Sequence, residues 1–181
     1  MLPLSVTIAL FGVRCSEDSP VSKQEIIHIN LEDAKAGYNK PFSLDIDKDG
    51  NGEFIFNATL IADAVGDHLR FAINSRYGNE VIGEYGNVKV LSSGDPVNES
   101  GAFDYDNEVL AVRTITNHET TWWGNWKGIQ NKYMGIRFQL NGSSYYGWIA
   151  ISVNEPNEQV IIHDMAYSKS TNSNGIQAGE H

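Results

Sequence analysis

Apolar and polar residues alternate along most of the chain, with a period of two rather than about 3.6. In the segment "KYMGIRFQL", every second residue is apolar: Met134, Ile136, Phe138 and Leu140. Similar short runs, many of them β-branched or aromatic, recur from residue 24 onward. Turn-forming clusters such as "NGS" and "NEPNEQ" separate several of these runs. The pattern predicts about nine or ten strands in an all-β, antiparallel sandwich resembling a jelly roll.

Two segments fit this alternation less well and are candidates for short helices. "NLEDAKAGY" can form one or two helical turns with Asn30 as the N-cap. "LIADAVGDHL" is compatible with either a helix or a strand. No repeat, low-complexity tract or interior linker divides the remainder, so residues 24–181 are expected to form one domain.

The acidic stretch "FSLDIDKDGNGEFIF", residues 42–56, places three carboxylates on alternate positions before a glycine. Alternate residues of a strand share one face, where like charges repel each other. Calcium, which takes about six to eight oxygen ligands, would remove this repulsion. In the pattern D-x-D-x-D-G, Asp45, Asp47 and Asp49 supply side-chain oxygens, and Gly50 permits the sharp turn.

The end of the acidic stretch distinguishes two kinds of calcium loop. An EF-hand closes with a glutamate at its twelfth position, which is Phe56 here, and no helical pattern flanks the loop. The Asn51 carbonyl and the Glu53 carboxylate can complete a nine-residue loop instead. This spacing resembles the calcium loops on β-hairpins of integrin-type propeller repeats. The alternative is a plain hairpin with an Asp-Gly or Asn-Gly turn. We expect a structural calcium ion bound by Asp45, Asp47, Asp49, Asn51 and Glu53.

A second acidic run, "FDYDNE", contains carboxylates on alternate positions: Asp104, Asp106 and Glu108. It lacks the glycine of the first loop. A second ion site and a solvated loop both fit this run.

Three tryptophans lie close together in the segment "NHETTWWGNWKGIQN": Trp122, Trp123 and Trp126. Exposed indoles can stack on the apolar C–H faces of sugar rings, so these residues are candidates for glycan binding. The alternative is that they cap one end of the hydrophobic core.

Local catalytic motifs are absent from the sequence, including G-x-S-x-G, H-E-x-x-H, the P-loop and G-x-G-x-x-G. The neighbours His163 and Asp164 would face opposite sides of a strand and could not form a dyad. We therefore expect a non-catalytic binding module. The alternatives are a structural or adhesive surface protein that binds another protein, and a hydrolase whose site is assembled from distant residues.

The chain of 181 residues carries 23 acidic and 13 basic residues, giving a formal net charge of −10. Nucleic acids and anionic membrane surfaces both attract basic patches. The charge therefore argues against either of them as a partner.

The only cysteine, Cys15, follows an apolar run of signal-peptide length, "MLPLSVTIALFGVR". This arrangement resembles a bacterial lipoprotein signal, with residues 1–14 as signal peptide and residues 15–23 as a tether from the lipidated cysteine. Glu17 and Asp18 resemble the surface-export signal of Bacteroidetes lipoproteins. The resemblance implies an exported protein, attached to the outer membrane or cell surface only through its lipid. The alternative is a buried first strand with an incidental cysteine.

Four segments taken in order, "DIDKDGNGEFIF", "YMGIRFQLNGSSYYGWIAISV", "IIHDMAYS" and "GIQAGE", resemble an uncharacterised group of secreted bacterial proteins. Members of that group carry an aspartate-rich loop early and a Y-G-W-I strand late. The resemblance covers roughly residues 42–179 and implies an exported β-domain without indicating an activity.

Overall fold

The computed structural model describes residues 24–105, 107–171 and 174–181. The strands are β1 (Ile26–Gly37), β2 (Phe42–Leu44), β3 (Phe54–Ala62), β4 (Asp67–Ser75), β5 (Glu80–Glu84), β6 (Asn87–Val88), β7 (Pro96–Val97), β8 (Phe103–Asp104), β9 (Asn107–Ile115), β10 (Thr120–Trp123), β11 (Lys132–Leu140), β12 (Ser143–Asn154), β13 (Gln159–Ser168) and β14 (Ile176–Gln177). These described residues contain no helix, and hence none that could span a membrane. The prediction of an all-β fold is confirmed. Cys15, the predicted signal peptide and the tether lie outside the described residues.

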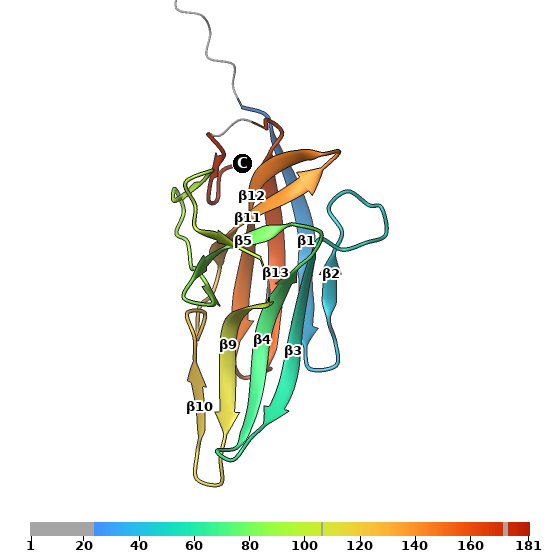
Figure 1. The fold of residues 1–181 in the computed structure, drawn as a ribbon. Coiled ribbons are helices and arrows are strands. Elements are labelled where there is room, and N and C mark those ends of the chain that lie inside the picture. Colours follow the sequence, from blue (N-terminus) through green and yellow to red (C-terminus); the bar gives the residue numbers. More distant parts are fainter. Residues whose placement is uncertain (1–23, 106, 172–173) are drawn as a thin grey trace, which may run out of the picture.

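Twelve strands belong to one sheet, whose main path is β1-β13-β12-β11-β5-β6-β9-β4-β3-β2. The sheet curls around the core, and its two halves face each other as the layers of a sandwich do (Figure 1). Hydrogen bonds nevertheless run from one half to the other through β5 and β6, and a bridge between Tyr38 and Ala58 links the two ends. The result is nearly barrel-shaped. Pairing is antiparallel except between β6 and β9 and at this bridge.

The alternation of side chains along β12 divides the apolar residues between two clusters. Ile149, Ile151 and Val153 point into the main core, where they join phenylalanines of the opposite half of the sheet. Trp148 and Ala150 point to the outer face and form a smaller cluster with the β7 region and the C-terminal segment. Burying a side chain such as Ile149, Ile151 or Val153 stabilises the fold by about 1.5–3 kcal/mol. Side chains on both faces of β12 are therefore buried, and their packing holds this strand in place.

Neither candidate segment forms a helix, and the strand alternative holds for the second. Residues 30–38 extend β1 beside β13, through a bulge at which Glu32 and Asp33 have φ of 55° and 54°. Residues 60–69 form the end of β3, a turn and the start of β4. At that turn the Asp63 carboxylate accepts hydrogen bonds from the N–H groups of Val65 (2.7 Å) and Gly66 (3.2 Å). Pairing across the sheet overrides the weak helical pattern in both segments.

Five of the fourteen strands contain only two or three residues: β2, β6, β7, β8 and β14. These short strands account for the difference from the nine or ten that were predicted. So few residues show no alternation of apolar and polar side chains, and their pairing depends on neighbours distant in sequence.

Candidate functional site

The acidic loop, residues 45–53, joins β2 to β3 in an antiparallel hairpin. Leu44 pairs with Phe54, and the Glu53 N–H donates to the Leu44 carbonyl at 2.9 Å. The strands predicted before and after the loop are therefore confirmed. Within the loop, Lys48 and Gly50 have φ of 62° and 92°. These left-handed positions turn the chain back on itself and bring residues from both sides of the loop together.

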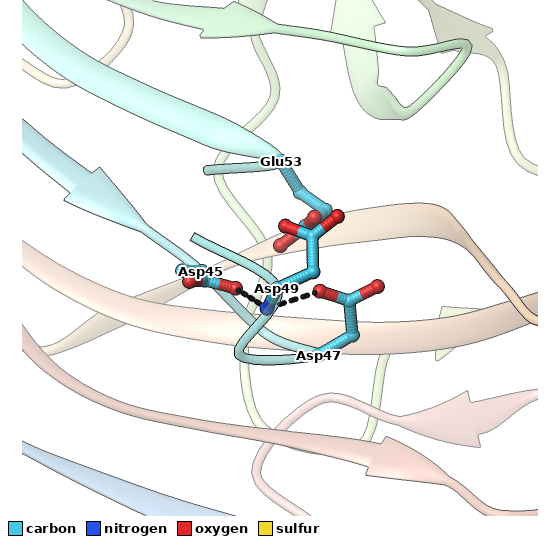
Figure 2. Close-up of side chains that lie close together, drawn as sticks. All are labelled: Asp45, Asp47, Asp49 and Glu53. Carbon is cyan, nitrogen blue, oxygen red and sulfur yellow. Dashed lines mark hydrogen bonds between the residues drawn. The ribbon is translucent and has the colours of Figure 1, made fainter. Parts of the chain in front are cut away.

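Four carboxylates converge inside the acidic loop: Asp45, Asp47, Asp49 and Glu53. One ligand oxygen from each can be chosen so that all four lie within 4.8 Å of one another (Figure 2). This cluster can hold a metal ion. Of the residues predicted as ligands, the structure brings together the four that carry carboxylates.

Backbone N–H groups orient the three aspartates. The Asp49 N–H contacts both Asp45 Oδ1 and Asp47 Oδ1 (Figure 2), with N–O distances of 3.2 and 3.1 Å. The N–H of Gly50 donates to Asp45 Oδ2 at 2.9 Å, and that of Asn51 donates to Asp49 Oδ1 at 2.7 Å. No lysine, arginine or histidine of the described residues forms an ion pair with these carboxylates. The loop thus holds its acids in place without supplying a positive charge.

Glu53 forms the buried side of the cluster, with 6% of its surface exposed. Its Oε2 accepts a hydrogen bond from the Ile46 N–H at 2.6 Å. Burial is the main cause that raises the pKa of Glu53, and the charges of Asp47 and Asp45 raise it further, against the lowering effect of the backbone N–H donors. A cation bound among these oxygens would favour the ionised form of Glu53.

Besides these four carboxylates, the sequence offers a fifth predicted ligand, Asn51, and a second acidic run for which an ion site and a solvated loop both fit. The Asn51 amide donates to Asp49 Oδ2 at 3.2 Å, while ligation by the Asn51 carbonyl stays a prediction. In the second acidic run, Asp106 lies outside the described residues. Asp104 is exposed on β8 and Glu108 is buried on β9, so the two described acids come from different strands.

The three tryptophans occupy different environments. Trp126 is fully buried, and its Nε1 donates to the Val88 carbonyl at 3.1 Å. Trp122 is half-buried and stacks on Phe71, with ring centroids 5.5 Å apart. Trp123 is 51% exposed. Trp126 is a core residue whose indole offers no face to a ligand, and Trp123 is the most exposed of the three indoles.

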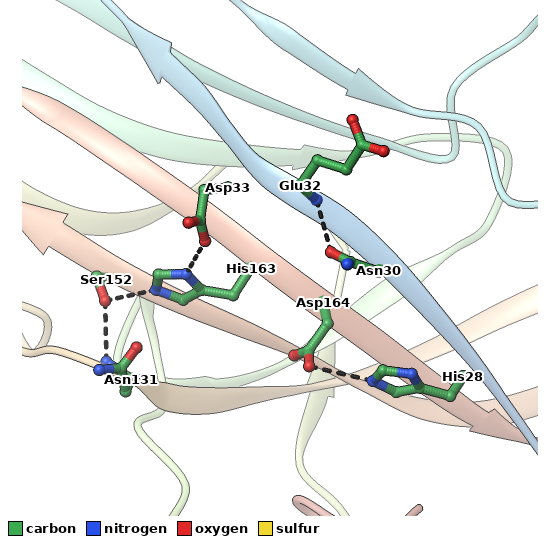
Figure 3. Close-up of polar contacts among 8 residues, drawn as sticks. All are labelled: His28, Asn30, Glu32, Asp33, Asn131, Ser152, His163 and Asp164. Atoms are coloured by element: carbon green, nitrogen blue, oxygen red, sulfur yellow. Dashed lines mark hydrogen bonds and ion pairs between the residues drawn. The ribbon is translucent and has the colours of Figure 1, made fainter.

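A hydrogen-bonded relay, formed by Asp33, His163 and Ser152, lies on the outer face of the sheet (Figure 3). Asp33 Oδ1 is 2.6 Å from His163 Nδ1, and His163 Nε2 is 2.7 Å from Ser152 Oγ. Two bulges create this arrangement, because Asp33 belongs to the β1 bulge and His163 is the extra residue of a bulge in β13. The order of contacts matches the Ser-His-Asp arrangement of hydrolases.

Burial restricts what the relay can do. Ser152 is only 1% exposed, and its Oγ also accepts a hydrogen bond from the Asn131 N–H at 2.9 Å. Asp164, next to His163, instead contacts His28 (Figure 3), with Oδ2 and Nε2 3.1 Å apart. His163 and Asp164 therefore have different partners. Sequence reasoning missed both His–Asp pairs, because their members are more than a hundred residues apart.

No family model matches this chain, and comparison with curated proteins and with solved structures gives no match.

Proposed function

We propose that this chain is an exported, non-catalytic domain that is stabilised by calcium in the acidic loop and recognises a glycan at the cell surface. The observation that carries the calcium assignment is the convergence of four carboxylates within 4.8 Å, without a cationic side chain paired to them in the described structure. Charge neutralisation by an ion accounts for such a cluster.

The chemistry of the ligands favours calcium over other metals. Oxygen ligands suit hard cations, whereas transition metals prefer the histidine or cysteine ligands that this cluster lacks. Magnesium requires a nearly ideal octahedron and retains several waters, while calcium accepts irregular sets of protein oxygens. A nine-residue loop with an irregular set of buried and exposed carboxylates matches the calcium requirement.

The position of the loop indicates a structural role for the ion. The loop joins β2 to β3, and Phe54 and Phe56 of β3 are fully buried in the main core. Extracellular calcium modules bind at about 0.1–1 mM, so an ion at about 1 mM adds roughly 0.4–1.4 kcal/mol to stability. By this contribution the ion would stabilise the β2–β3 hairpin against the core.

The cellular location rests on the sequence pattern around Cys15 and on the resemblance to secreted bacterial proteins. Metabolic labelling with a fatty acid tests it. We expect label in the full chain and none in Cys15→Ser. Equal labelling of both proteins would contradict the anchor.

Exposed aromatic side chains, among them Trp123 at 51% and Tyr85 at 98% exposed, support a glycan as the ligand. Aromatic rings of this kind stack on sugar C–H faces. A cell-surface protein is the competing partner, and the binding experiment described below for Tyr85 separates the two.

Thermal unfolding with calcium and with chelator tests the calcium site. We expect calcium to raise the melting temperature of the wild type, because it binds only the folded loop. Asp47→Asn should lose this response. Asp67→Asn, which changes an exposed aspartate outside the loop, is the matched control and should keep it. An unchanged melting temperature of the wild type would remove the calcium site from the proposal.

A second candidate function, a serine-type hydrolase, is favoured by the contacts among Asp33, His163 and Ser152. In such an enzyme Ser152 Oγ attacks an acyl carbon and its proton passes to His163 Nε2. We rank it second because Ser152 is buried. A fluorophosphonate probe that labels the wild type and Ser144→Ala, but not Ser152→Ala, would establish it. Absence of labelling in the wild type would dismiss it.

A further inference from the structure

A cleft of ≈ 600 Å³ lies between the β5–β6 hairpin and the segment that links β7 to β8. Its apolar lining includes Ile82 and Leu91, both almost fully buried. Its polar lining includes Glu84, Lys89 and Asn98. This volume is within the range of about 300–1,000 Å³ that is typical of small-ligand sites.

Backbone hydrogen bonds hold both walls of the cleft. The Gly83 N–H donates to the Ala102 carbonyl at 2.9 Å, and the Lys89 N–H donates to the Ile82 carbonyl at 2.9 Å. On the opposite side, the Ala178 N–H donates to the Asp95 carbonyl at 2.8 Å. The cleft is therefore formed before any ligand binds, which lowers the entropy lost on binding.

The polar groups of the cleft have unused hydrogen-bonding capacity. Within the described structure, the carboxylate of Glu84 and the ammonium of Lys89 pair neither with each other nor with another residue. Asn98 uses its Oδ1 to accept from the Ser100 N–H at 3.0 Å, which leaves its Nδ2 available as a donor. A donor, an acceptor and an amide thus face one cleft with an apolar floor.

Tyr85, at the rim of the cleft, contributes nothing to the core, since it is 98% exposed. Tyr85 and Gly86 are the two central residues of the β5–β6 hairpin, with φ of 54° and 75°. Such a turn strongly favours Asn-Gly, and a bulky residue at positive φ is strained. The fold alone therefore gives no reason for a tyrosine here.

A second tyrosine in the same kind of turn provides an internal comparison. Tyr77 and Gly78 have φ of 59° and 77°, and the Asn79 N–H closes the turn on the Arg76 carbonyl at 3.0 Å. The Arg76 guanidinium lies 5.5 Å from the centre of the Tyr77 ring, and Tyr77 does not line the cleft. Tyr85 differs from it in standing open at the edge of a polar cavity.

We propose that this cleft binds a neutral oligosaccharide, a proposal that rests on the glycan recognition proposed above. The Tyr85 ring stacks on the C–H face of one sugar, while Glu84 and Lys89 bond to neighbouring hydroxyls. The net charge of −10 opposes acidic sugars and so favours a neutral one. The recognition surface is then this cleft and not the tryptophan segment.

An array of neutral oligosaccharides (α- and β-glucans, xylans, mannans and chitin fragments), probed with the whole protein in calcium, tests this assignment. We expect binding to one class, reduced about tenfold or more in Tyr85→Asn. Asparagine suits the turn, so this variant should fold at least as well as the wild type. Tyr77→Asn, the matched control, should bind as the wild type does. Glu84→Gln should weaken binding without lowering the melting temperature.

The outcomes separate failure of the cleft from failure of glycan recognition. If binding survives in Tyr85→Asn and Glu84→Gln but is lost in Trp123→Ala, the cleft is not the glycan-binding site. Glycan recognition as the proposed function would still hold. A folded wild type that binds no neutral oligosaccharide on the array would overturn both.

Discussion

The acidic loop is a hairpin loop and the relay joins two bulges of the same sheet to Ser152, and the electrostatics of the two clusters differ. In the acidic loop, Asp45, Asp47, Asp49 and Glu53 face one another, and only backbone and amide N–H groups donate to them. In the relay, Asp33 faces His163, which also contacts Ser152. The nearby Asp164 likewise faces His28.

The difference lies in whether the protein itself supplies a partner for each carboxylate. Asp33 and Asp164 each have a histidine as partner, and Ser152 is hydrogen-bonded on both sides. The acidic loop has excess negative charge, which an external cation can neutralise. We infer that the relay chiefly holds strands together, whereas the acidic loop can accept a metal ion.

The largest expected effect is that of Ser152→Ala. Its Oγ accepts from Asn131 and contacts His163 in a buried position, so alanine leaves two polar groups without that partner. We expect a loss of about 1–3 kcal/mol in the free energy of unfolding. Urea unfolding measures it, and the loss should be equal with calcium and with chelator.

Ser144→Ala is the control for that comparison, since Ser144 lies on the same strand and its Oγ accepts from Gln139 Nε2 at 2.7 Å near the surface. Its loss should be well below that of Ser152→Ala. A similar loss in both variants would show that the relay contributes no more to the free energy of unfolding than an ordinary surface hydrogen bond does.

Asp47→Asn should have the next largest effect, and its sign should depend on calcium. In about 1 mM calcium, the variant loses the roughly 0.4–1.4 kcal/mol that the ion contributes. In chelator it should be more stable than the wild type, because one of four mutually repelling charges is removed. Unfolding curves under both conditions measure the two signs. Destabilisation of equal size in both conditions would contradict ion binding by Asp47.

The two clusters also differ in how far the sequence predicts them. All proposed ligands of the loop lie within nine residues, so spacing alone predicted that the carboxylates converge. Asp33 and His163 are 130 residues apart, and they meet because two bulges in paired strands face each other. Local sequence does not encode that pairing, and for Trp126 it left core packing and ligand binding as open alternatives. The alternation of apolar residues, by contrast, was sufficient for the all-β class.

The pH dependence of calcium binding should reflect the raised pKa of Glu53. Between the ordinary glutamate value of 4.5 and its raised pKa, the folded protein without calcium holds a proton that the unfolded chain has released. Stability in chelator therefore falls as the pH rises through this window. Calcium affinity rises over the same window, because the ion and the proton compete for the carboxylate.

Calorimetric titration of calcium at several pH values measures this competition, and Glu53→Gln is the matched variant. The glutamine keeps an oxygen for the Ile46 N–H but does not titrate. Its calcium affinity should be weaker and should vary less with pH over this window. The same pH slope in both proteins would assign the effect to other groups.

Asp33→Asn should have the smallest effect, although it changes a residue of the relay. The Asp33 side chain is 70% exposed, and ion pairs of this exposure contribute about 0–1 kcal/mol. The asparagine oxygen can still accept from His163 Nδ1, so the ring keeps its orientation toward the buried Ser152. We therefore expect a loss of no more than a few tenths of a kcal/mol, independent of calcium. A loss as large as that of Ser152→Ala would mean that the charge of the Asp33 carboxylate holds the relay together. Both clusters would then depend on carboxylate charge, and they would differ only in that the relay contains a histidine as its partner.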